Sequence, residues 1–206
     1  MGPLSQPRPL PLLRVVCHYE FVRLCGWTAL PEFPLGMFGT GGCEVTESII
    51  SPADFAIAAW HEEGRWQVAA LPLAIANDLN SLVNALRSQP TNGGATGLLS
   101  VSEDFFVIVR VLGHDIRFVL SDVTAATEWA LAQQVLEYLN LPMPNEDDEQ
   151  QPAGDLGIFA DLGLEPMELG AICDDLELYP DEQLEAIAHR LGFGEEFSEA
   201  IDSVAD

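Results

Sequence analysis

Alternating apolar and polar positions between residues 54 and 120 predict β-strands joined by tight turns. Residues 54–61 and 66–70 alternate on either side of Glu63-Gly64, which predicts a β-hairpin. Residues 97–101, 105–112 and 115–120 predict three more strands, and Gly113-His114 is a two-residue turn signal between the last two. Sequential strands joined by tight turns form an antiparallel sheet.

Two helical periods complete this part of the chain. One lies in residues 78–88, where four apolar residues recur at helical spacing: Leu79, Leu82, Val83 and Leu86. The other runs from a cap at Ser121 or Asp122 to about Asn140. The order β-β-α-β-β-β-α over residues 51–140 predicts an α+β fold, with a five-stranded antiparallel sheet and helices covering one face.

A linker and three short helices are expected after this sheet domain. Residues 141–154 contain three prolines around the acidic run 146–149, which predicts an acidic, proline-containing linker. Within residues 155–206, three apolar sets recur at helical spacing: Leu169, Ile172, Cys173 and Leu176; Leu184, Ile187, Ala188 and Leu191; Phe197, Ala200, Ile201 and Val204. Helices with such narrow apolar stripes are expected to pack together or against the sheet.

No helix or strand period persists in residues 1–50. We expect this segment to be a disordered extension or the product of a mis-set translation start, with the true start near Met37 or Val45. Arg14 interrupts the only apolar run that resembles a signal peptide, and no run has the length of a membrane helix. The sequence therefore predicts a cytoplasmic protein without a membrane partner.

The last predicted hairpin places two arginines together. A two-residue turn at Gly113-His114 sets Arg110 opposite Arg117, on the face of the sheet away from Val109 and Phe118. Like charges in this arrangement are unfavourable unless an anion joins them. The anion can be a carboxylate of the acidic C-terminal half, or a carboxylate of a ligand or partner.

The net charge of the chain limits the kinds of molecule that it is expected to bind. The chain has 33 acidic and eight basic side chains, with a formal net charge of −25 and no lysine. Nucleic-acid binding depends on cations that neutralise phosphates, so direct binding to RNA, DNA or anionic lipid is not expected. Such a charge favours encounter with a basic protein surface, or serves solubility alone. The predicted partner surface comprises six carboxylates of the C-terminal helices: Asp174, Asp175, Glu177, Asp181, Glu182 and Glu185.

No catalytic pattern is found in the sequence. His61-Glu62-Glu63 matches the start of a zinc deaminase site, but the P-C-x-x-C segment that supplies two further zinc ligands is absent, so the chain is not itself a zinc deaminase. Its four cysteines form no zinc-ligand spacing, and Cys173 occupies an apolar helix position typical of a buried thiol. No cofactor, metal or catalytic residue is predicted.

Four segments resemble the actinobacterial tRNA adenosine deaminase-associated protein family. They are DFFVIVRV (104–111), LSDVTAATEWALAQQVLEYL (120–139), PAGDLGIFADLG (152–163) and LELYPDEQLEAIAHRLGFGEEF (176–197). The resemblance covers about residues 54–197, and residues 1–50 depart from the family pattern. It implies an accessory role beside a tRNA adenosine deaminase and supplies no catalytic residues.

Two hypotheses of function follow. In the first, the chain is an acidic accessory protein whose carboxylates bind or modulate a tRNA adenosine deaminase, at the cationic surface expected to face tRNA. In the second, it is an enzyme or small-anion-binding protein that uses the outer sheet face around Arg110 and Arg117. Arginines bound to the chain's own carboxylates would disfavour the second hypothesis, and a concave pocket with convergent polar groups would favour it.

Overall fold

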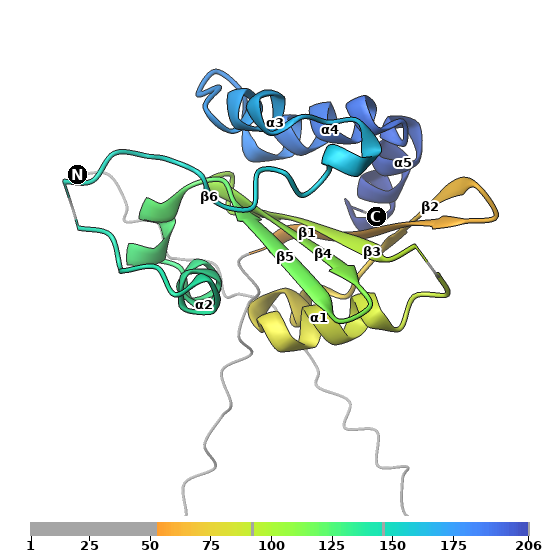
Figure 1. Ribbon diagram of the computed structural model, residues 1–206, viewed down its shortest axis with the longest axis horizontal. Helices are drawn as coiled ribbons and strands as arrows, with labels where there is room; N and C mark the ends of the chain where they lie inside the picture. The colour runs from red at the N-terminus through yellow and green to blue at the C-terminus, as the bar shows by residue number, and fades with distance from the viewer. Residues whose placement is uncertain (1–52, 92, 146, 206) are drawn as a thin grey trace, which may run out of the picture. The chain divides into compact units, whose positions relative to one another are not determined.

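The computed structural model describes residues 53–91, 93–145 and 147–205, which belong to one compact unit. Residues 1–50, where the sequence predicts a disordered extension or a mis-set start, lie outside the described residues. Within this unit, an antiparallel sheet lies between two layers of helices (Figure 1).

Six strands form the sheet in the order β2-β1-β3-β4-β5-β6, and all neighbouring strands are antiparallel. They are β1 (Ala53–Glu62), β2 (Arg65–Ala70), β3 (Ala95–Val101), β4 (Phe105–Leu112), β5 (Asp115–Leu120) and β6 (Ala153–Gly154). The predicted α+β class and its five strands are confirmed. The sixth strand is formed by the end of the predicted linker, which returns to pair with β5.

One face of the sheet packs against α1 (Leu79–Arg87) and α2 (Ala130–Leu139), which follow the 3-10 helices η1 (Leu73–Asn77) and η2 (Val123–Thr127). Alternate residues of β4 and β5 are buried on this side, including Val109 and Phe118, as the strand pattern predicts. Asp78 caps α1 by accepting a hydrogen bond from the Ser81 amide at 2.8 Å.

The predicted helix from Ser121 or Asp122 to Asn140 is wrong in its first half. Asp122 caps only the short η2, by accepting a hydrogen bond from the Thr124 amide. Trp129 then has extended backbone angles, so α2 begins at Ala130. The Trp129 indole donates to Asp104 at 2.7 Å, which is a tertiary contact that a helical period cannot reveal. The predicted end at Asn140 is confirmed by its left-handed conformation.

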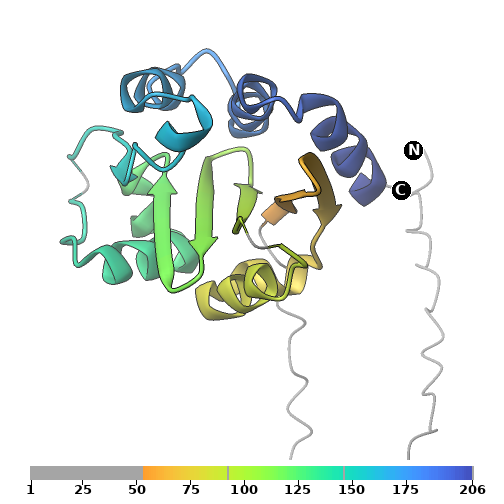
Figure 2. The ribbon, with the colours of Figure 1, turned by 45° about the vertical axis from the view of Figure 1, so that its right-hand side comes forward.

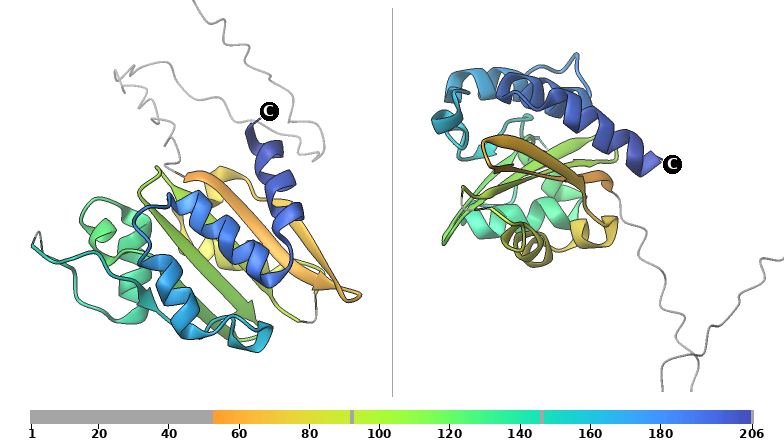
Figure 3. Two further views of the ribbon diagram at one scale, coloured as in Figure 1. Left: turned by 90° about the horizontal axis from the view of Figure 1, so that it is seen from above. Right: turned by 90° about the vertical axis from the view of Figure 1, so that its right-hand side faces the viewer.

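The second face packs against three helices: α3 (Pro166–Cys173), α4 (Pro180–Leu191) and α5 (Gly194–Ala205). The 3-10 helix η3 (Ala160–Leu162) comes before α3 in the chain. Figures 2 and 3 show these helices crossing the sheet on the side opposite α1. They bury sheet residues that include Phe106, Ile108 and Val119. The Phe55 and Phe197 rings pack edge to face, with their centres 5.7 Å apart. The three predicted C-terminal helices are confirmed, and helices cover both faces of the sheet.

Leu176 is an exception to the helical pattern of this segment. Its spacing from Leu169 predicts an apolar position in the same helix, but α3 ends at Cys173 and Leu176 is 76% exposed. The prediction is wrong because the chain leaves the helix at Asp174 and turns towards Pro180, where α4 begins.

Candidate functional site

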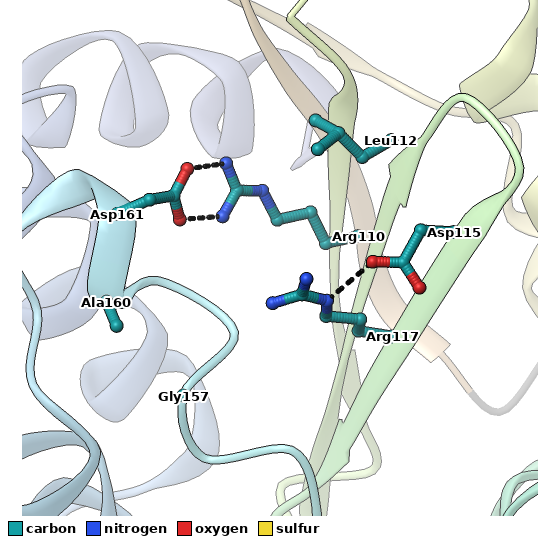
Figure 4. Close-up of a pocket in the computed structure, with 7 residues that line it drawn as sticks. All are labelled: Arg110, Leu112, Asp115, Arg117, Gly157, Ala160 and Asp161. Atoms are coloured by element: carbon teal, nitrogen blue, oxygen red, sulfur yellow. Dashed lines mark hydrogen bonds and ion pairs between the residues drawn. The ribbon is translucent and has the colours of Figure 1, made fainter.

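The predicted arginine pair is present on β4 and β5. Arg110 and Arg117 are register partners, as the two-residue turn requires, and Gly113 in that turn has φ +63°. Both lie beside the segment that connects β6 to η3, and Figure 4 shows their side chains with those of Asp115 and Asp161. Together with this segment they line a pocket of about 330 Å³.

Arg110 is buried and binds groups of its own chain. Its guanidinium donates two hydrogen bonds to the Asp161 carboxylate, the longer one at 2.7 Å (Figure 4). It donates a third to the Ile158 carbonyl. Its guanidinium carbon also lies 5.9 Å from the centre of the Phe159 ring. The hydrogen bonds from Arg110 hold the pKa of the Asp161 carboxyl below its usual value.

Arg117 is more exposed and binds different carboxylates. Its Nε donates to Asp115 at 2.8 Å, and Nη1 lies 3.5 Å from Asp155. The hydrogen bond to Asp115 raises the pKa of the Arg117 guanidinium above its usual value. Each like-charged residue therefore has its own anion, which removes the need for a ligand between them.

The six predicted partner-surface residues lie in the α3–α4 connection and on α4. Asp174, Asp175 and Glu177 are exposed in the connection. Asp181 and Glu182 are exposed in the first turn of α4, where Glu182 accepts a hydrogen bond from the Tyr179 amide at 2.9 Å.

Glu185 is placed differently from the other five. It accepts a hydrogen bond from Ser198 of α5 and lies 3.6 Å from His189, so it helps to join two helices. The structure therefore gathers five of the six carboxylates around the start of α4 and assigns the sixth to a contact between α4 and α5.

Asp174 and Asp175 form part of an open groove of about 490 Å³ at the end of the sheet. Two sequence-distant parts of the chain contribute further carboxylates to it, and residues 150–151 contribute two glutamines. Its opposite side is formed by the β3–β4 turn and the end of β5, which supply Glu103, Asp104 and Asp122. We call this feature the acidic groove; its apolar part comprises Leu176, Leu178, Tyr179 and Pro180.

The acidic groove was only partly predicted from the sequence. Asp174 and Asp175 stand out in an acidic helical segment, but Glu103 and Asp104 were assigned only to a turn. Their contribution depends on the packing of the C-terminal helices over the sheet, which brings the α3–α4 connection to this end of β4. The only local indication of their role was that the predicted Ser-Glu-Asp turn carries two charged side chains.

The thiol at the base of the groove is not a candidate nucleophile. Cys173 is 6% exposed, and burial raises the pKa of its thiol to about 12, with a smaller contribution from Asp174. Among the described residues, no group of three His, Cys, Asp or Glu side chains is arranged to hold a metal ion. In the same part of the chain, every helix is too short or too polar to cross a membrane.

Sequence comparison identifies the family. A family profile described as Rv3753c-like tRNA adenosine deaminase-associated protein matches residues 54–194. The chain belongs to this family. It is also 39% identical to Protein Rv3753c of Mycobacterium tuberculosis over 155 residues, which is 74% of this chain and 90% of that protein. No solved structure matches the chain at a significant level.

The segment that matches the family includes the sheet from its second residue onward, both arginines and most of the C-terminal helical layer. It also includes every residue that lines the acidic groove. The resemblance that the four sequence segments indicate is therefore confirmed, and the groove lies within the family's shared region.

Proposed function

We propose that this protein is an acidic accessory protein that binds a tRNA adenosine deaminase and modulates its access to tRNA. Membership of a family described as tRNA adenosine deaminase-associated supports the choice of partner. The observation that carries the proposal is the concentration of exposed carboxylates around the start of α4, on a chain with a net charge of −25.

The charge distribution supports a basic protein surface as the target. An enzyme that binds tRNA needs cationic side chains to neutralise phosphates. Exposed carboxylates attract the same cationic surface and accelerate encounter with it, and this attraction weakens as salt screens it. Binding there would place the acidic protein in competition with tRNA, in the cytoplasm and without direct contact with nucleic acid or membrane.

A test of this proposal is co-purification from cells that express the chain and the deaminase encoded by the same genome. We expect the two proteins to purify together at low salt and to separate at high salt. The absence of association even at low salt would remove the proposal. A filter-binding assay would then measure whether a saturating amount of the chain lowers the affinity of the deaminase for tRNA.

The alternative function, an enzyme or anion-binding protein around Arg110 and Arg117, has less support. Arg110 has three internal acceptor contacts, and Arg117 has two carboxylates of its own chain. A ligand anion would have to displace Asp115 or Asp155 to reach Arg117. Titration with phosphate or acetate, followed by the Arg117 side-chain NMR signal, would reveal such a displacement.

A further inference from the structure

We propose that the acidic groove is the docking site for an extended protein segment in which arginines or lysines alternate with large apolar side chains. This inference rests on the proposed function and deepens it, because it names the surface used and the chemistry of the segment that fits it. Three independent features of the groove support it: exposed apolar side chains, a rigid wall and uncompensated charge.

The apolar part of the groove is exposed to an unusual degree. Leu176 is 76% exposed and Tyr179 is 60% exposed, while Leu178 beside them is 36% exposed. Large apolar side chains that gather at one concave place, instead of being scattered singly, are typical of an interaction site. A purely ionic partner would leave these side chains in water, so the occupant must bring apolar groups of its own.

The wall that carries these side chains is held in place. The Gln183 side chain is buried, and its amide donates hydrogen bonds of 2.9 Å to the carbonyls of both Ile172 and Asp175. The Asp175 carboxylate accepts from the Glu177 amide, and Glu182 accepts from the Tyr179 amide. The connection is therefore ordered with its leucines outside, so a partner does not have to pay for ordering it.

Among the described residues, no arginine forms an ion pair with a carboxylate of the groove. Its lining has no basic side chain and presents four exposed carboxylates, those of Glu103, Asp104, Asp174 and Asp175. The fifth carboxylate of the lining, Asp122, is buried and accepts hydrogen bonds from Thr124. In the described ranges, the arginine ion pairs use other carboxylates, namely those of Asp115, Asp155, Asp161 and Glu168. Cations spaced along an extended segment can therefore reach carboxylates on both sides of the apolar part.

The β3–β4 turn presents two of these carboxylates at a conformational cost. Ser102 and Glu103 both have positive φ values, 51° and 54°, although neither is glycine. Asp54 stabilises the turn by accepting hydrogen bonds from the Glu103 amide and the Ser100 hydroxyl. Backbone strain of this kind is often retained near functional surfaces. It adds to the argument from charge and exposure but does not carry it.

The test uses two synthetic peptides of equal length and charge, one of alternating arginine and leucine and one of alternating arginine and serine. Titration of each into the full chain at low salt gives the two dissociation constants. The proposal predicts that the leucine peptide binds about tenfold more tightly, because only it can cover the apolar part. Equal affinities would overturn the proposal and leave nonspecific attraction between opposite charges.

Variants assign the preference to the groove. Leu176→Ser with Tyr179→Ser should bring the two affinities close together, whereas Met167→Ser, an 86% exposed residue outside the groove, should preserve the tenfold difference. Asp174→Asn with Asp175→Asn should weaken both peptides more than Glu195→Gln with Glu196→Gln, which removes the same charge from α5. Equal effects of the groove variants and their controls would contradict the assignment.

NMR provides a local reporter of the site. The Trp129 indole N–H donates to Asp104 of the groove, whereas the Trp66 indole donates to the Leu191 carbonyl away from it. We expect the leucine peptide to shift the Trp129 indole signal and to leave the Trp66 signal in place. An unchanged Trp129 signal at saturation would place the peptide elsewhere.

The peptide experiment and the deaminase experiment fail independently. If the leucine peptide binds in the groove but the deaminase does not bind the chain, the docking site stands and the proposed function falls. If the deaminase binds but Leu176→Ser with Tyr179→Ser leaves its affinity unchanged, the function stands and this docking site is wrong.

Discussion

Arg110 and Arg117 lie opposite each other on β4 and β5, yet their guanidinium groups bind carboxylates from different parts of the chain. Asp161, which binds Arg110, precedes the C-terminal helical layer and belongs to η3. The Arg110–Asp161 pair therefore ties that layer to the sheet. Some carboxylates of the chain are used in internal ion pairs, whereas those around the start of α4 take part in none of the ion pairs of the described residues.

The Arg110–Asp161 pair should contribute more to stability than the Arg117–Asp115 pair. Asp161→Asn leaves a buried guanidinium without its counterion, and we expect it to lower the free energy of unfolding by about 2 kcal/mol. Asp115→Asn should lower the free energy of unfolding by less than Asp161→Asn does, because Arg117 is partly exposed and retains Asp155. Urea unfolding of both variants measures the difference, and equal losses would contradict this ranking.

The contribution of Asp161 should also depend on pH. The hydrogen bonds from Arg110 lower the pKa of this carboxyl from its ordinary value of 3.8, so the folded state favours the ionised form. The stability difference between the wild type and Asp161→Asn should be full above the ordinary pKa and should diminish as the pH falls through the lower folded pKa. Urea midpoints of both proteins between about pH 6 and about pH 2.5 test this. A difference that grows towards low pH would have the wrong sign.

Gly154 should be essential for the return of the chain to the sheet in β6. It has φ +105°, and a Cβ there would overlap the Phe118 carbonyl. We expect Gly154→Ala to lower the free energy of unfolding by about 2 kcal/mol or more, because it combines backbone strain with this overlap. Gly163→Ala is the matched control, because Gly163 has φ +92° but open space at the Cβ position. This substitution should lower the free energy of unfolding by about 1 kcal/mol. Thermal unfolding compares the two, and an equal loss would show that the overlap relaxes.

Cys173 should be chemically inert while the chain is folded. Its burial and its pKa of about 12 keep the thiol protonated near neutral pH. We expect iodoacetamide at about pH 8 to modify Cys173 at least about tenfold more slowly in the folded chain than in urea, as read by peptide mass spectrometry. Rapid modification without denaturant would show that this end of the groove opens in solution.

The sequence predicted the features that depend on local patterns. The Gly113-His114 turn has a fixed length, so it determined which residues of β4 and β5 are opposite each other, including the arginine pair. The spacing of apolar residues located α1, α4 and α5, because each buries one stripe of side chains against a single layer. These elements follow from neighbours in the sequence.

The features that the sequence missed depend on distant contacts. The strand β6 has only two residues, which are too few to show strand alternation, so the sequence predicted a linker there. Asp161 lies 51 positions from Arg110, and no local pattern distinguishes it from other acids. The break at Trp129 and the exposure of Leu176 likewise follow from where the surrounding elements pack.

We propose above all that this member of the family binds a tRNA adenosine deaminase through its exposed carboxylates. The most direct test is isothermal titration calorimetry of the purified deaminase with the full chain at increasing salt. We predict a saturable complex at low salt whose dissociation constant rises steeply with salt, and weaker binding by Asp174→Asn with Asp175→Asn than by Glu195→Gln with Glu196→Gln. A deaminase that shows no binding at the lowest salt, or an affinity independent of salt and of these carboxylates, would contradict the account.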